Sequence, residues 1–482
     1  MSRNLYVEQL ELGARDIKDL EFDLKSRDSL EKYLIGLQHI YMNDSVFYKI
    51  LQEIEKELPD LKVAGRPGMN GWTIFVLGGL RLNENCDFDK LGNIINNHLG
   101  VRGLLGLNDS ITRKQFSLTT VKDNFRILSD DFWKRVNLII VNEGHSLLGV
   151  EEKDIRARID SFVLESNVHF PTDLSLLMDA MRKVVTLTGK HCILNKISGW
   201  REFKSYLGKI KKEYRRLSTT KKSNSKNPET IAKRNALIYE LCNKYLAICV
   251  QFIEKTEGSI IEIGLSCGVT SLASVKEIKF YILHAHKMME IVKRRILKNE
   301  TIPHAEKIFS IFEEYTEWIS KGKAGVKQEL GLMVCVVEDR NGFILNHEVM
   351  VKKKDKDVAV TITEETKKLF PRLISVSFDR GFYSKENLEN LEKLLPNNVG
   401  MNKKGRYSKV DKEREDTTSF KDAADKHSAI ESCINGLEHT GLDRCPDRTL
   451  NGFKRYVAVS VVARNIFKIG AIKLASLQKL AS

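Results

Sequence analysis

Apolar and polar positions near the start of the chain follow a helical pattern. Apolar side chains recur every three or four positions, as Leu30, Tyr33 and Leu37 illustrate, and this spacing places them on one face of a helix. The pattern predicts helix over residues 16–58 and favours a pair of packing or dimerisation helices. Glycine and proline at 65–68 interrupt it.

Residues 70–145 predict several short helices separated by glycine and polar turns. One covers 88–95, and another runs from near Ser110 through Phe125. Short helices with tight turns are typical of a helix-turn-helix DNA-binding domain, and they are equally typical of any small helical domain. The DNA-binding interpretation therefore depends on position and charge more than on the pattern.

Alternation of apolar and polar residues replaces the helical pattern at 156–165, RARIDSFVLE. Ile159 and Val163 fall on one face and Asp160 on the other, and β-branched and aromatic residues are frequent. We therefore predict a strand here. Thr172 follows at a position suited to the N-cap of an amphipathic helix.

The long stretch 174–320 predicts helix almost throughout, with a polar loop at 218–228. Up to this loop, residues 201–226 hold ten Lys and Arg against two Asp and Glu, a net charge of +8. Residues 293–295, Lys-Arg-Arg, form another basic cluster. These runs are either solvated helix faces or contacts for phosphate groups, and the sequence leaves both interpretations open.

The clearest local signal lies at 329–351, where two β-rich runs flank Asn341-Gly342. This dipeptide predicts a hairpin with a type I′ turn. Helices and strands then alternate as far as Gly441, which is placed to stop the last helix. The predicted elements are a helix at 363–370, a buried strand at 374–379, a helix at 385–395 capped by Ser384, a strand at 399–402 and a helix at 419–439.

With residues 174–320 set aside, the predicted order is three strands, then helix, strand, helix, strand and helix. This is the order of a ribonuclease-H-like α/β fold, whose mixed sheet has three antiparallel and two parallel strands. We predict such a catalytic core, with a large all-helical insertion after the first strand and an N-terminal helical DNA-binding region. The predicted boundaries are 1–64 for an N-terminal helical region, 65–150 for the DNA-binding domain, 151–173 and 321–445 for the core, 174–320 for the insertion and 446–482 for a C-terminal helical tail.

Composition and charge limit the class of protein. The 482 residues carry 78 Lys and Arg against 64 Asp and Glu, a net charge of +14, which suits a polyanionic partner but also occurs in basic enzymes that bind no nucleic acid. The eight cysteines lack zinc-type spacing, which is typical of buried thiols in a reducing compartment. No signal-peptide core and no run of roughly 20 apolar residues is found. We expect a soluble, cytoplasmic protein.

Three carboxylates occupy positions that the predicted fold could bring together. Asp160 lies within the first strand, Asp379 ends a later strand at the edge where ligands collect, and Glu431 lies on the last predicted helix. Such oxygen ligands suit Mg²⁺ or Mn²⁺, and two ions could activate an attacking hydroxyl and stabilise the leaving oxygen. Each residue also has an ordinary interpretation: a lysine partner for Asp160, a turn for Asp379 and a solvated helix face for Glu431.

Four stretches carry a family resemblance: RIDSFVLESNVHFPTDLSLLMDAMR at 158–182, IFEEYTEWISKGKAG at 311–325, SFDRGFYS at 377–384 and HSAIESCINGLEHTGLDRCPDRTLNGFKRYVAVSVVARN at 427–465. They resemble bacterial insertion-sequence transposases with an Asp-Asp-Glu triad, closest to the loosely defined ISNCY grouping. The resemblance implies the fold, metal-dependent chemistry and recognition of terminal inverted repeats by the N-terminal region. It maps the triad onto Asp160, Asp379 and Glu431.

Three residues near Glu431 depart from a pattern of tyrosine, arginine and lysine that some related groups carry. The corresponding residues are Ala424, His427 and Glu438, and His427 either contacts DNA or packs as an ordinary helix residue. Asp339, just before the hairpin turn, is expected to face water. The acidic residues ranked below the triad are Asp173, Asp179, Asp339 and Glu438.

Basic residues supply the expected DNA contacts. In the catalytic core we predict phosphate contacts from Arg380 and from three residues of a basic loop at 403–414: Lys403, Lys404 and Arg406. In the N-terminal DNA-binding domain we predict them from Arg113 and Lys114. The predicted function is a transposase that binds the inverted repeats of its element, assembles as a homo-oligomer, cleaves to leave a 3′-hydroxyl and joins that end to target DNA. The alternatives are a structure-selective nuclease on the same fold and a non-catalytic DNA-binding protein derived from a transposase.

Overall fold

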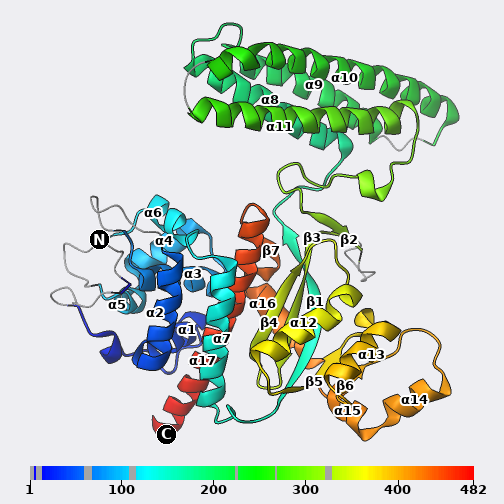
Figure 1. The fold of residues 1–482 in the computed structure, drawn as a ribbon. Coiled ribbons are helices and arrows are strands. Elements are labelled where there is room, and N and C mark those ends of the chain that lie inside the picture. The colour runs from blue at the N-terminus through cyan, green and yellow to red at the C-terminus, as the bar shows by residue number, and fades with distance from the viewer. Residues whose placement is uncertain are drawn as a thin grey trace. The chain divides into compact units, whose positions relative to one another are not determined.

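The computed structural model describes residues 5–6, 14–58, 68–107, 115–222, 226–265, 269–320 and 328–481 (Figure 1). The chain divides into two compact units. The first, called here the sheet unit, combines Met1–Asn167 with Glu317–Ser482, and the second, the helical unit, covers Val168–Thr316. The helical unit is thus one continuous stretch between the first strand and the later strands. Arg113 and Lys114 lie outside the described residues.

The described part of the sheet unit contains a seven-stranded mixed sheet. Its strands are β1 (Ile155–Ser166), β2 (Glu317–Ile319), β3 (Glu329–Asp339), β4 (Ile344–Met350), β5 (Leu373–Phe378), β6 (Val399–Met401) and β7 (Arg444–Cys445). Strand β1 pairs antiparallel with β3, which pairs antiparallel with β4 and β2. On its other edge β1 pairs parallel with β5 and the short β7, and β5 pairs parallel with β6. The predicted run of three antiparallel and two parallel strands is confirmed, with β2 and β7 added.

The β3–β4 hairpin has a different turn from the predicted one. A type I′ turn needs positive φ at both central residues, but of Asn341 and Gly342 only Gly342 adopts it, at φ +82°. The Gly342 amide donates to the Asp339 carbonyl at 3.1 Å, and the Asp339 amide donates to the Phe343 carbonyl at 2.9 Å. The prediction of a type I′ turn was wrong because Asp339 organises a wider loop, in which its carboxylate accepts from the Asn341 and Phe343 amides.

Helices on the sheet follow the predicted order with shifted boundaries. Helix α12 (Asp355–Leu369) begins eight residues before the predicted start because its first turn is polar and carries little apolar signal. Helix α13 (Lys385–Leu394) begins as predicted, with the Ser384 hydroxyl accepting from the Asn387 amide. Helix α12 packs against β4, β5 and α13, and the later helix α15 (Thr418–Ala424) packs against β5 and β6.

The N-terminal part of the sheet unit is helical, as predicted. Its helices are α1 (Ser29–Met42), α2 (Asp44–Glu57), α3 (Gly71–Asn83), α4 (Phe88–Asn97), α5 (Leu99–Leu104), α6 (Leu118–Phe125) and α7 (Asp130–Leu147). Helix α6 starts at Leu118 with Ser117 as its N-cap, later than the predicted start near Ser110. Every residue of α3 is buried, whereas α4 and α6 expose polar residues.

The C-terminal helix α17 (Leu450–Ala481) is a core element and not the predicted tail. It packs against α1, α3 and α7 and contacts β4 (Figure 1). Helices α1 and α17 cross closely, since a Cβ atom on Gly36 would lie 2.3 Å from the Ile466 carbonyl oxygen. Buried Asn465 of α17 donates to Asn137 of α7 at 2.8 Å and to the Ile344 carbonyl at 2.9 Å. These contacts join the N-terminal helices, the C-terminal helix and the sheet in one core.

Asp339 is buried, so the prediction that it faces water was wrong. Its carboxylate lies 2.6 Å from Nε2 of His145 on α7, and both side chains are only 1% exposed. Helix α7 covers the hairpin turn, which the local sequence did not reveal. Asp339 therefore links the hairpin to the N-terminal helices.

His347 on β4 predicts a pH dependence of stability. Burial lowers its pKa from an ordinary 6.5 to about 3, and Lys134 adds to the lowering. Because the folded pKa lies below the unfolded value, the unfolded chain takes up a proton that the folded protein does not as pH falls below 6.5. The free energy of unfolding should therefore fall by about 1.2 kcal/mol between pH 6 and pH 5 from this residue alone.

His347→Leu should remove that contribution, which urea unfolding at the two pH values would measure. The matched control is exposed His286→Gln on helix α11 (Val269–Val292), which should leave the pH dependence unchanged. Equal slopes in wild type and His347→Leu would contradict the prediction.

The described helical unit is built from four long helices: α8 (Asp173–Leu194), α9 (Phe203–Lys221), α10 (Pro228–Leu265) and α11. Their apolar faces form one core that includes Leu177, Ile210, Tyr245 and Ile278. The predicted break at 218–228 is shorter, since α9 continues to Lys221. After residue 297 the predicted helix is absent apart from a short turn at His304–Glu306. By length and composition alone, α10 is the one described helix that could cross a membrane, a property that core helices of soluble proteins share.

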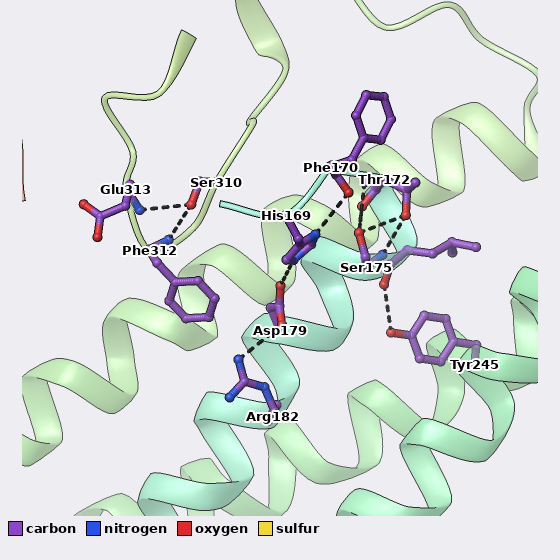
Figure 2. Close-up of polar contacts among 11 residues, drawn as sticks. His169, Phe170, Thr172, Ser175, Asp179, Arg182, Tyr245, Ser310, Phe312 and Glu313 are labelled. Carbon is purple, nitrogen blue, oxygen red and sulfur yellow. Dashed lines mark hydrogen bonds and ion pairs between the residues drawn. The ribbon is translucent and has the colours of Figure 1, made fainter. Parts of the chain in front are cut away.

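The start of α8 is held by local polar contacts (Figure 2). Thr172 is the N-cap, as predicted, and forms a reciprocal capping box with Ser175. The Asp179 carboxylate lies 2.6 Å from Nε2 of His169 and 3.3 Å from Nη2 of Arg182. Asp173 pairs with Arg295 at 2.6 Å. Both Asp173 and Asp179 therefore have partners within the helical unit.

Candidate active site

Asp160 and Asp379 lie at the same level on neighbouring strands. The parallel pairing of β1 with β5 ends at Ile159 opposite Phe378, so the next residue on each chain segment is the aspartate. Asp160 is half-buried, and its carboxylate accepts from the Ser161 amide at 2.7 Å. Asp379 is exposed at the carboxyl end of β5, where a tight turn at Arg380–Phe382 begins. The register therefore brings together two carboxylates that are far apart in sequence.

Alternation along β1 defines which face of the sheet these carboxylates occupy. Arg158 and Asp160 share one face, and Ser161 points to the other. Arg158 contacts the loop before helix α16 (Ala429–Leu437), with its guanidinium donating to the Lys426 carbonyl at 3.2 Å. Ser161 instead donates to Asp355 at the start of α12, at 2.5 Å. Asp160 thus lies on the α16 face of the sheet.

Helix α16 carries Glu431 in its first turn, on an exposed position. The predicted single helix at 419–439 is broken, because α15 ends at Ala424 and Lys426 adopts a positive φ of +57°. Ile430 and Cys433 of α16 are buried, and the helix packs on β1. The predicted stop at Gly441 is confirmed by its φ of +105°.

His427 connects the strand that ends in Asp379 to the helix that carries Glu431. Its Nδ1 atom lies 2.9 Å from the Ser377 hydroxyl of β5. Burial lowers the pKa of His427, while the negative charges of Asp379 and Glu431 act in the opposite direction. Those interactions place both carboxylates near this imidazole. The half-buried ring therefore packs against β5 and does not project freely into solvent.

Arg158 was missed by the sequence reasoning, although it stands two residues before Asp160 in the same strand. It is nearly buried, and besides Lys426 its guanidinium donates to the Asp339 carbonyl at 2.9 Å and lies 3.5 Å from Glu338. A charged residue at an inward position of a buried strand was the available signal. Arg158 fixes the loop that precedes α16 to the strand of Asp160.

Asp355 is a further carboxylate near the candidate site that the sequence reasoning did not select. A Cβ atom on Gly381, in the turn after Asp379, would lie 2.9 Å from its Oδ2 atom. Burial, followed by the charges of Asp355, Glu348 and Asp160, raises the pKa of the Cys335 thiol. Asp355 therefore approaches the same strand ends from the α12 face of the sheet.

The comparisons with known proteins identify this region of the chain. Residues 299–466 match the family model described as a transposase DDE domain. This match is consistent with a DDE-type transposase. No curated protein and no solved structure matches the chain. A DDE domain implies a ribonuclease-H-like fold, in agreement with the mixed sheet. The matched residues include Asp379 and Glu431, whereas Asp160 precedes them across the helical unit.

DDE-type transposases generally use divalent metal ions, and the DDE domain offers oxygen ligands for them. Asp160 and Asp379 supply carboxylates at one level of the sheet, and Glu431 is exposed on the helix that covers the same face. Among the described residues no three His, Cys, Asp or Glu side chains form a ready metal cluster. The oxygen donors of these carboxylates fit a hard cation.

The predicted phosphate contacts of the DDE domain separate into two groups. Lys403 is paired with Asp411, and Arg414 of the same basic loop donates to the Met401 carbonyl and to Glu415. Those two cations hold the loop and helix α14 (Lys409–Asp416) together. Arg380, Lys404 and Arg406 are exposed. They are the better candidates for contact with DNA.

Proposed function

We propose that the protein is a transposase that cleaves DNA at the terminal inverted repeats of its element and joins the ends to target DNA. Asp160, Asp379 and Glu431 are proposed as its catalytic carboxylates. The proposal rests on the parallel pairing of β1 with β5, which places Asp160 and Asp379 at the same level on the face of the sheet that α16 covers. The transposase DDE domain match supports the same chemistry.

The proposed mechanism gives each residue a separate task. A pair of bound Mg²⁺ or Mn²⁺ ions would supply activation of the attacking hydroxyl and stabilisation of the leaving oxygen. Asp160, Asp379 and Glu431 would hold the ions as oxygen ligands. Exposed Arg380, directly after Asp379, would bind a phosphate beside the cleaved bond. His427, through Ser377, would hold the start of α16 against β5 and so orient Glu431.

The other parts of the chain are proposed to bind and assemble DNA. Recognition of the inverted repeats is assigned to the N-terminal helices, where α4 and α6 expose polar residues. Two DNA ends must be joined in one complex, so we propose a homo-oligomer acting in the cytoplasm. The net charge of +14 supports a DNA partner.

Strand joining distinguishes this proposal from its alternatives. A structure-selective nuclease would cleave without joining, and a non-catalytic DNA-binding derivative would do neither. The test incubates the purified protein with duplex DNA that carries the element's own ends and a target plasmid. We expect cleaved and joined products with Mg²⁺ or Mn²⁺, none after chelation by EDTA, and recovery when the metal is restored.

Two outcomes would overturn the proposal. Cleavage without any joined product would favour the nuclease. End binding with neither product, under every metal condition, would favour the DNA-binding derivative. A matched duplex with scrambled ends serves as the control and should give no joined product.

A further inference from the structure

Helix α9 of the helical unit has one apolar face, and that face is occupied. Phe203, Ile210 and Leu217 recur every seven residues and are buried in the core that α9 forms with α8 and α10. A strict seven-residue repeat places them on one narrow stripe of the helix. The opposite side of α9 therefore faces solvent along its whole length.

That solvent side is almost entirely cationic. Eight exposed Lys and Arg residues, called here the basic face, lie on α9 and its C-cap: Lys204, Lys209, Lys211, Lys212, Arg215, Arg216, Lys221 and Lys222. The one acidic residue within α9, Glu213, is half-buried. Among the described residues, Arg216 alone of the eight forms an ion pair, with Glu213 at 3.4 Å. The other seven cations of the basic face have no ion-pair partner among the described residues.

The arrangement is unfavourable for an isolated helix. Lys211 with Arg215, and Lys212 with Arg216, place like charges four residues apart, where they repel each other. In helix α10 of the same unit, by contrast, Glu240 and Lys244 have opposite charges at this spacing and form an ion pair. A solvated surface gains nothing from such repulsion. An anionic partner along the helix would relieve it.

The geometry favours duplex DNA over an anionic membrane as the partner. An amphipathic helix binds a membrane surface by burying its apolar face in the lipid, but the apolar face of α9 is already buried in protein. From Lys204 to Lys222 the helix extends about 27 Å, and a DNA strand offers a phosphate every 3.4 Å or so. The exposed cations of α9 therefore extend over a length that several phosphates of one DNA strand would occupy.

We infer that the basic face of α9 binds the phosphate backbone of duplex DNA without regard to sequence. The inference rests on the proposed function for the identity of the polyanion, and it assigns a role to the helical unit that the carboxylates of the DDE domain do not provide. Such a surface would hold the DNA next to the element's ends or the target DNA. It would contribute affinity and salt dependence, but no sequence specificity.

The test compares full-length wild type with K211Q/K212Q/R215Q/R216Q. Fluorescence anisotropy would follow binding to a duplex of about 30 base pairs that lacks the inverted repeats, in EDTA, between about 50 and 200 mM salt. Loss of four phosphate contacts should lower the slope of log affinity against log salt by about 3 to 4, and weaken binding at least about tenfold. Glutamine keeps a helix propensity close to that of Lys and Arg, so the melting temperature should stay equal or rise.

A matched control removes four exposed lysines from another part of the same unit. K276Q/K279Q/K287Q/K298Q changes residues in and just after α11, which are interspersed with glutamates, and should keep the wild-type slope. The double variant K211Q/R215Q, expected to lower the slope by about 2, provides a second test should the quadruple variant lose helix content.

Three results would overturn the inference. The first is an unchanged slope and affinity in the α9 variants, and the second is an equal loss in the control, which would indicate bulk charge alone. The third is loss of binding to phosphatidylserine vesicles with DNA binding intact, which would indicate a membrane partner. The assay needs no metal and no cleavage, so failure of the catalytic carboxylates would leave its result unaffected.

Discussion

Asp160→Asn, Asp379→Asn and Glu431→Gln should each reduce strand cleavage and joining by about 10³-fold or more, with binding to the element's ends retained. Each change replaces a carboxylate by a neutral amide of nearly the same size, so the fold is kept while the proposed metal ligand loses its charge. Ligated metal ions stabilise the transition state by several kcal/mol, and every 1.4 kcal/mol or so is a factor of ten in rate. Single-turnover cleavage in Mg²⁺ and in Mn²⁺, beside a gel-shift measurement of end binding, checks the expectation.

Two further variants make the result specific. Glu364→Gln removes an exposed carboxylate from α12, on the opposite face of the sheet, and should leave cleavage unchanged. Asp355→Asn changes a carboxylate on the α12 face of the sheet, which accepts a hydrogen bond from Ser161. It should reduce cleavage much less than the three triad variants do. Activity retained by Glu431→Gln but lost in Asp355→Asn would transfer the third ligand position to Asp355. Near wild-type activity in Asp160→Asn or Asp379→Asn would remove that residue from the site.

Asp339→Ala should destabilise the sheet unit by about 3–5 kcal/mol, because three polar groups lose the carboxylate they contact and each such loss costs roughly 1–3 kcal/mol when the group is buried. The change leaves the buried His145 ring without its 2.6 Å partner. It also leaves the Asn341 and Phe343 amides without the carboxylate that accepts from them in the hairpin turn. Guanidinium unfolding at neutral pH, followed by circular dichroism, would measure the loss.

A double-mutant cycle separates the energy of the His145–Asp339 contact from that of the hydrogen bonds that Asp339 accepts in the hairpin turn. If the contact matters as a pair, His145→Ala and Asp339→Ala together should cost less than the sum of the two, with a coupling of about 1 kcal/mol or more. Glu240→Gln, which removes one member of an exposed ion pair in the helical unit, is the matched control and should leave the unfolding midpoint unchanged. A loss below about 1 kcal/mol in Asp339→Ala would show that the buried contact contributes little.

Strands and helices with a strong local pattern were predictable. The alternation at 156–165 lies within β1, and the Ser384 cap begins α13 because its hydroxyl satisfies a backbone amide of the first turn. Elements whose ends depend on packing were predicted less well. The polar first turn of α12 hides its start, and the break between α15 and α16 appears only because the positive φ of Lys426 turns the chain where Arg158 holds it.

Residues whose role depends on a distant neighbour were the ones misjudged. Turn residues are usually exposed, so Asp339 was expected in water, yet α7 brings His145 over it from nearly 200 positions earlier in the chain. Residues 446–482 were predicted to be a C-terminal helical tail. Its contacts with α1, α3 and α7 make it part of the core.

By itself the sequence determined the strand order, the three separate carboxylates and the concentration of charge before residue 226, because alternation, helical spacing and composition are local properties. The tertiary structure decided which of these residues meet. The register of β1 on β5 puts Asp160 level with Asp379, and the Ser377–His427 contact brings the start of α16 to β5. The tertiary structure also decided which cations have an ion-pair partner within the protein. Lys403 is paired with a carboxylate, whereas the basic face of α9 is open to solvent. Pairing and burial arise between segments far apart in the chain, so no local pattern encodes them.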